Sequence, residues 1–228
     1  MIYTMDYNGH SSTEYGVIFN DYPSFSGAKK QYTTSAIAGM VGELVGKDTG
    51  VSNLEISCVF SVVNDNFFEN IRAIKKWLYG PGKLKFSDMD DTFYRVLKIN
   101  YGEIEREMRY FGTFTVTFTC IPYEYRDDGN AEWPMICSNP YSTCKPIYRI
   151  NGEGMCTLAV NGKSVKAQVG QNLTIDSEKM ICYRNDGTLA NVQMQGDYED
   201  LWLPNGSCDI SVSSGFDLSI IPQWGYAV

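Results

Sequence analysis

The chain carries a single histidine, His10, directly after an Asn-Gly turn. A serine or cysteine nucleophile needs a general base, so a Ser-His-Asp or Cys-His site in this chain would have to use His10. The sequence contains no G-x-S-x-G motif of the kind that presents a nucleophilic serine. We therefore interpret His10 as an exposed turn residue and expect no catalytic residues.

Seven cysteines are the next candidates for chemistry. They contain no C-x-x-C pair, and with one histidine in the chain they lack the closely spaced ligand pairs of a zinc site. We interpret them as reduced, mostly buried thiols and expect no metal site, while a disulfide between Cys137 and Cys144 stays an open alternative. The seven are Cys58, Cys120, Cys137, Cys144, Cys156, Cys182 and Cys208.

Two acidic turns could supply oxygen ligands to calcium, but neither has the D-x-[DN]-x-[DN]-G spacing of a calcium loop. The stretch Gly42–Asp48 resembles a phosphate loop, yet three residues separate its glycines where four are needed, and Asp48 stands where serine or threonine is required. We therefore expect solvated turns, a flexible arm and no cofactor. The turn carboxylates are Asp88, Asp90 and Asp91 in one turn, and Asp127 and Asp128 in the other.

Three glutamates, Glu103, Glu105 and Glu107, alternate along one stretch and would share one face of a strand. Paired carboxylates can hydrolyse glycosidic bonds, but their separation in space decides that chemistry. We interpret the three as a charged edge that hinders strand association, and we expect no enzyme activity. A hydrolase acting on cell-wall polymers is the least favoured alternative.

Composition and charge set the class of protein. Apolar residues make up 43% and aromatic residues 14% of the chain, which is typical of a folded, strand-rich protein. The formal net charge is −8 without any Lys/Arg-rich block, which argues against direct nucleic-acid binding and against an anionic membrane surface. No leader-like start and no apolar run of roughly 20 residues is present, so we expect synthesis in the cytoplasm and no membrane insertion.

One helix is predicted at about 65–79, where apolar residues recur at helical spacing. Asn64 or Asp65 can cap its start, and Gly80-Pro81-Gly82 ends it. The glycine-punctuated segment at about 26–50 has few side chains to anchor it in a core, so we predict a long arm or loop there.

Alternating apolar residues predict strands over most of the first half. Asn8-Gly9 predicts an opening hairpin whose second strand lies around Tyr15–Asn20. Along 112–121, apolar residues alternate with threonines, which is the clearest strand pattern in the chain. Further strands are predicted at 54–60, 83–86 and 92–101, with 103–110 forming part of a protruding two-stranded ribbon.

Proline and turn formers gather at 125–146, so we place a domain boundary there and predict domains 1–130 and 131–228. Beyond it, short strand-like runs are broken by turn signals at a spacing typical of an antiparallel sandwich, with no helix required. The turn signals are Asn151-Gly152, Asn161-Gly162, Asn185-Asp186-Gly187 and Asn205-Gly206. The predicted fold class is mainly β with two domains.

Short motifs follow one another along nearly the whole chain. In the first half they are Tyr7-Asn8-Gly9, Glu14-Tyr15-Gly16-Val17, Trp77-Leu78-Tyr79-Gly80, Leu84-Lys85-Phe86-Ser87-Asp88 and Phe93-Tyr94-Arg95-Val96. In the second half they are Leu201-Trp202-Leu203-Pro204-Asn205-Gly206, Cys208-Asp209-Ile210 and Ile220-Ile221-Pro222-Gln223-Trp224. In order and spacing this series resembles the siphophage distal tail proteins. The family's Ile-Pro-Gly-Arg-Asp-Gly-like stretch is replaced here by Ile37–Gly42, which keeps the glycines and loses the proline and charges.

The resemblance implies an N-terminal tail-ring domain, like a β-barrel or sandwich with one helix and an extended arm, and a C-terminal galectin-like antiparallel β-sandwich. It implies a structural, non-enzymatic tail component of the virion, forming a hexameric ring at the distal end of the tail tube. Its partners would be further copies of the chain, the major tail tube protein, and tail-tip, tail-associated or baseplate proteins that carry host recognition.

A carbohydrate-binding adhesion module of the tail tip is the main alternative. Trp202 or Trp224 could stack on the face of a sugar ring. Against this, galectin-type recognition relies on a polar cluster that includes histidine and arginine, and the C-terminal half has no histidine. A glycan array would separate the two hypotheses, since fold alone is weak evidence of function.

Overall fold

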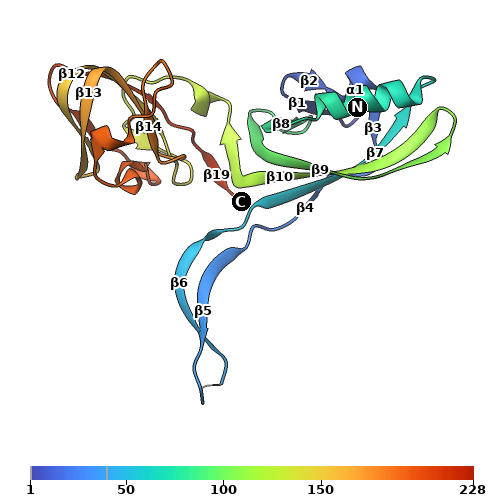
Figure 1. Cartoon of the computed structure of the whole chain (residues 1–228), viewed down its shortest axis with the longest axis horizontal. Coiled ribbons are helices and arrows are strands. Elements are labelled where there is room, and N and C mark those ends of the chain that lie inside the picture. The colour runs from blue at the N-terminus through green and yellow to red at the C-terminus, as the bar shows by residue number, and fades with distance from the viewer. Residues whose placement is uncertain (1, 40) are drawn as a thin grey trace. The chain divides into compact units, whose positions relative to one another are not determined.

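The computed structural model describes residues 2–39 and 41–228, with the backbone alone for Asp48 and Thr49. It divides the chain into two compact units, one of residues 1–124 with Val228 and one of residues 125–227. Antiparallel strands dominate both units (Figure 1). The predicted mainly β, two-domain fold class is therefore confirmed.

The first unit is built on one sheet with the strand order β2-β1-β8-β9-β10-β7-β3, and β4 also pairs with β7. β8 lies antiparallel to β1 and β9, and β7 lies antiparallel to β10, β3 and β4. The strands are β1 (Met5–Tyr7), β2 (His10–Ser11), β3 (Val17–Phe19), β4 (Ser24–Phe25), β7 (Leu54–Val63), β8 (Gly82–Phe86), β9 (Thr92–Met108) and β10 (Phe111–Arg126).

Alternate side chains of β7 and β10 form the core of the first unit. Along 54–62 of β7 and 114–120 of β10, the side chains on one face are at most 4% exposed, while the threonines of β10 point to the other face. The alternation predicted along 112–121 is confirmed, because a strand directs successive side chains to opposite faces. The buried cross-strand pairs are Phe114 with Phe60, Val116 with Cys58, and Phe118 with Ile56.

The predicted helix is present as α1 (Phe67–Trp77), with Phe67, Ile71, Ile74 and Trp77 buried. The predicted cap is wrong. The N-cap residue is Asn66, whose side chain makes no capping hydrogen bond. The Asn64 side chain instead accepts from the backbone N–H of Asn66 at 2.8 Å, and so it orders the turn before the helix and leaves the helix start itself uncapped.

Tyrosine hydroxyls satisfy carbonyls at the end of α1. Tyr101 donates to the Leu78 carbonyl at 2.8 Å, and Tyr7 donates to the Gly80 carbonyl at 2.6 Å. The last carbonyls of a helix have no partner within the helix, so Tyr101 supplies one at the C-cap residue Leu78, and Tyr7 holds the turn that follows. Gly80 adopts φ +76°, a left-handed conformation that favours glycine, and the helix ends before it as predicted.

The opening hairpin has a different second strand from the predicted one. Asn8 and Gly9 turn β1 back into β2, so that Tyr7 pairs with His10. Ser11 and Glu14 then form a capping box that starts a short 3₁₀ helix, η1 (Ser12–Tyr15). Because this box turns the chain away, β3 pairs with β7 and takes no part in the opening hairpin.

The segment predicted as a long arm or loop is a ribbon of two paired strands, β5 (Lys30–Ala36) and β6 (Glu43–Val51). The two strands pair antiparallel with each other and form a separate two-stranded sheet (Figure 1). The prediction missed the strands because it took the glycines of this segment as evidence for a loop. Gly39 and Gly42, at φ +84° and +95°, lie in the turn between the strands, whereas Gly46 and Gly50 are accommodated within β6.

The second unit contains a six-stranded sheet with the order β14-β13-β12-β17, in which β15 also pairs with β13 and β18 with β12. A separate pair is formed by β11 and β16. The strands are β11 (Ser138–Asn139), β12 (Ile147–Val160), β13 (Lys163–Asp176), β14 (Ile181–Tyr183), β15 (Met194–Gln195), β16 (Gly206–Ser207), β17 (Ile210–Val212), β18 (Asp217–Ile221) and β19 (Gly225–Ala227). Helical turns are limited to η2 (Asp128–Asn130), η3 (Asn191–Gln193) and η4 (Tyr198–Leu201) among its residues.

Not every predicted turn in the second unit is a turn. Asn161-Gly162 joins β12 to β13 with positive φ at both residues, as a two-residue hairpin requires. Asn151-Gly152 instead lies inside β12, so the prediction is wrong there. A Cβ at Gly152 would overlap the Phe216 ring, so this glycine permits a close approach inside the unit.

Candidate binding surfaces

His10 is exposed beside the opening turn. Its Nδ1 lies 3.1 Å from Oε2 of Glu14, and no hydroxyl or thiol is hydrogen-bonded to its ring among the residues that the structure describes. The backbone N–H of Ser11, and then His10, lower the pKa of the Glu14 carboxyl. The local geometry is that of a capped turn, in which the Glu14 carboxylate accepts a hydrogen bond from the Ser11 backbone N–H.

The cysteines are free thiols, and six of the seven are buried. Burial raises the pKa of Cys58, Cys120 and Cys144 to about 12, so these thiols stay protonated near neutral pH. Cys137 is the exposed one, and it forms no disulfide with Cys144. The six buried cysteines are therefore core side chains.

We expect a thiol-specific reagent such as DTNB to label one cysteine rapidly in the native protein at pH 8, and the remaining six only after unfolding. The reason is that only a solvent-accessible thiolate attacks the reagent. Absorbance at the reagent's product wavelength gives the count, and Cys137→Ser should remove the rapid phase. Rapid labelling of two or more thiols in the native state would contradict the burial described here.

In each acidic turn, one carboxylate accepts hydrogen bonds from other side chains of the protein. Tyr3 donates its hydroxyl to Asp88 at 3.0 Å. Asp128 accepts from Arg126 Nε at 3.0 Å and from the indole Nε1 of Trp224 at 2.9 Å. Groups of three or more His, Cys, Asp or Glu placed to hold a metal are absent from the described residues.

Glu103, Glu105 and Glu107 lie on the exposed part of β9, in the ribbon that β9 forms with β10. Glu103 and Glu105 line a shallow groove of 290 Å³ together with the hydroxyls of Thr113 and Thr115. Their neighbour Arg106 stacks over the rings at the start of α1, 4.9 Å from the Phe68 ring centre. The predicted ribbon is confirmed, and it ends in a charged and aromatic tip.

The arm, defined here as residues 30–51, presents apolar side chains without a core to cover them. All seven residues of β5 are exposed. A ribbon with this surface gains stability when another surface packs on it, and its outer edges can add strands to a partner. The phosphate-loop-like stretch Gly42–Asp48 lies in the turn and β6, and the side chain of Asp48 lies outside the described atoms. The large apolar side chains, each at least 46% exposed, are Tyr32, Ile37, Val41, Leu44, Val45 and Val51.

The two tryptophans considered for sugar stacking differ in environment. Trp224 is 8% exposed, and its ring centre lies 5.7 Å from those of Trp133 and Tyr141, so it belongs to a packed aromatic cluster. Trp202 is half-buried, and the Lys145 ammonium lies 4.7 Å from its ring centre. Its indole N–H donates to the Ser177 carbonyl. Trp224 therefore has no open ring face, whereas Trp202 also lines a pocket of 230 Å³ beside Lys163, Asp200 and Pro204.

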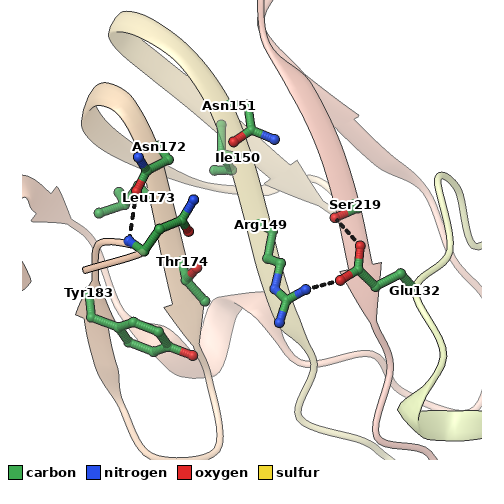
Figure 2. A pocket seen from close by; sticks show the side chains of 10 residues that line it. Glu132, Arg149, Ile150, Asn151, Asn172, Leu173, Thr174, Tyr183 and Ser219 are labelled. Carbon is green, nitrogen blue, oxygen red and sulfur yellow. Dashed lines mark hydrogen bonds and ion pairs between the residues drawn. The ribbon is translucent and has the colours of Figure 1, made fainter. Parts of the chain in front are cut away.

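A polar pocket of 480 Å³ lies on the sheet of the second unit (Figure 2). It is built on cross-strand neighbours, because the register places Arg149 of β12 beside Thr174 of β13 and Ser219 of β18, and Thr174 beside Tyr183 of β14. A second row places Asn151 beside Asn172. Outward polar side chains of four strands thus meet at one place. The sequence analysis named Asn151 only as part of a turn signal, and it predicted no binding site at these residues.

Three interactions hold the two ends of this pocket, as Figure 2 shows. Arg149 forms an ion pair with Glu132, which also accepts from the Ser219 hydroxyl at 3.3 Å. At the other end, the Asn172 side-chain oxygen accepts from the backbone N–H of Asn185 at 2.8 Å. This bond directs the Asn172 amide, because the oxygen is engaged and the NH₂ group remains as a donor.

Within the described part of the chain, no helix has the length and apolar character needed to cross a membrane.

Comparison with known proteins gives a fold relationship. No protein-family model and no curated protein matches the sequence. Among solved structures, the chain is similar to the Dit protein (gp 19.1) of phage SPP1, described as a paradigm of the hub adsorption apparatus in phages that infect Gram-positive bacteria. The TM-score is 0.65 at 15% identity, over 96% of this chain and 98% of that one. The resemblance to distal tail proteins is thus confirmed for the fold.

Proposed function

We propose that this chain is a structural, non-enzymatic component of a phage or prophage tail, placed in the virion at the distal end of the tail tube. The observation that carries this proposal is the fold shared with SPP1 Dit over nearly the full length of both chains. The motif series that resembles distal tail proteins spans both units and supports the proposal independently of the fold.

The proposed assembly is a hexameric ring that connects the tube protein to tail-tip or baseplate proteins and, through them, to host recognition. A closed ring uses one interface repeatedly, with two different patches that meet around the circle. The exposed arm is a suitable first patch, because it is a two-stranded sheet that carries exposed apolar side chains. A net charge of −8 suits a ring whose lumen lets DNA pass without binding it.

Negative-stain microscopy of the purified protein at several concentrations, with light scattering for mass, tests this proposal. We expect ring-shaped particles with six-fold symmetry and the mass of six chains. The same preparation co-expressed with the tube and tail-tip proteins should give rings stacked on a second component. Monomers in every preparation, including the co-expressed one, would refute the ring.

A further inference from the structure

The polar pocket of the second unit has the dimensions and composition of a small-ligand site. Its 480 Å³ lies within the range of roughly 300–1,000 Å³ that such sites occupy. The residues that line it come from β12, β13, β14 and β18 and from the segments beside them. Side chains held on paired strands are positioned more rigidly than side chains on loops, so the arrangement exists before a ligand arrives.

The polar groups in the pocket are mostly uncharged and can both donate and accept. Thr174 is only 3% exposed, yet its hydroxyl lines the pocket and has no hydrogen-bond partner among the described residues. The Asn151 amide likewise lacks one within the described part of the chain, and the Asn172 NH₂ group is directed by its bond from Asn185. A ligand hydroxyl in the pocket can therefore bond to the Thr174 hydroxyl without displacing a partner within the protein.

Charge narrows the class of ligand. The guanidinium of Arg149 is the cation that Figure 2 shows in the pocket, and Glu132 neutralises it. An anionic ligand would have to displace Glu132, whereas a neutral ligand can use the remaining N–H donors of the guanidinium. The pocket therefore favours a neutral ligand with many hydroxyls over a phosphate or a carboxylate.

One wall of the pocket is aromatic. The half-exposed ring of Tyr183 lies beside Thr174, at the end of the row opposite Ser219. An aromatic ring offers an apolar face to the C–H groups of a sugar, while the amides and hydroxyls serve its O–H groups. We propose that this pocket binds a neutral saccharide through Asn151, Asn172, Thr174 and Tyr183, a binding activity that goes beyond ring formation.

An array of neutral hexose, deoxyhexose and N-acetylhexosamine glycans, printed beside sialylated and phosphorylated ones, tests this proposal with the full-length protein. We expect binding to one or more neutral glycans, followed by calorimetric titration with the best of them. The double variant Asn151→Ala/Asn172→Ala should bind at least about tenfold more weakly, because two hydrogen bonds to the ligand are lost.

Gln168→Ala is the matched control, because Gln168 is an exposed amide on β13 outside the pocket. It should bind like the wild type. No binding to any neutral glycan, binding to anionic glycans only, or equal loss in Gln168→Ala would each overturn the proposal. Microscopy of the same samples keeps the two proposals apart, since loss of sugar binding should leave the rings intact.

Discussion

Replacing residues 30–51 with a single Asn-Gly turn is expected to leave the protein folded and to abolish ring formation. At the base of the arm, the Ser52 N–H donates to the Lys29 carbonyl at 2.8 Å, and the Lys29 N–H donates to the Ser52 hydroxyl at 2.9 Å. These two residues are placed to flank a two-residue hairpin turn. The described arm contains no buried side chain, so its removal should change the free energy of unfolding by less than about 1 kcal/mol.

Light scattering and negative-stain microscopy measure the assembly, and fluorescence-detected melting measures the fold, because all four tryptophans lie outside the arm. A matched control shortens only the tip, with Asn-Gly in place of residues 37–42 between the paired Ala36 and Glu43. It should still form rings if the strands carry the interface. Rings from the armless variant would show that the contacts between copies lie elsewhere in the chain.

Features set by neighbouring residues could be predicted from the sequence. The spacing of Phe67, Ile71 and Ile74 predicted α1, and the alternation through Phe114 and Phe118 predicted a buried strand face. Both patterns depend on the geometry of one element, and burial of one side is enough to leave the pattern in the sequence. The ribbon of β9 and β10 was predicted from the alternation of Glu103, Glu105 and Glu107, although this part of β9 is mostly exposed.

Features set by strand pairing could not be predicted in the same way. The pocket joins Glu132, Arg149, Asn172 and Ser219, which become neighbours only through the register of β12 with β13 and β18. A weak signal did exist, since Arg149 and Asn151 alternate with buried Tyr148 and Ile150. The signal marks an outward polar face, but it does not say which strands lie beside it.

Trp224→Ala is expected to destabilise the second unit by about 3–5 kcal/mol, the usual cost of removing a buried tryptophan. Trp224 fills an aromatic cluster and donates to Asp128, and its backbone N lies 2.9 Å from the position that a Cβ on Gly129 would occupy. The melting temperature of this unit should fall by on the order of 15 °C. Trp202→Ala, at a half-buried site, should cost a fraction of that.

Trp224→Phe isolates the hydrogen bond from the packing, because it keeps an aromatic ring and removes the indole N–H. Burial opposes ionisation of Asp128, but hydrogen bonds from Arg126 and Trp224 outweigh it and hold the pKa of this carboxyl below its usual range. A carboxyl with a lowered pKa in the folded state stabilises the protein above its unfolded pKa and loses that effect as the pH falls through the folded pKa. The stability difference between wild type and Trp224→Phe should therefore be largest near neutral pH and narrow below about pH 4.

Chemical unfolding at pH 7, 5, 4 and 3 measures this difference, with Asp128→Asn as the background in which it should no longer depend on pH. A Trp224→Ala variant of wild-type stability that had lost glycan binding would give the opposite assignment, with Trp224 as a ligand contact. The packing argues against that outcome. A ring held between Trp133, Tyr141 and the η2 turn has no free face to offer a sugar, so the saccharide site belongs on the open sheet around Asn151 and Asn172.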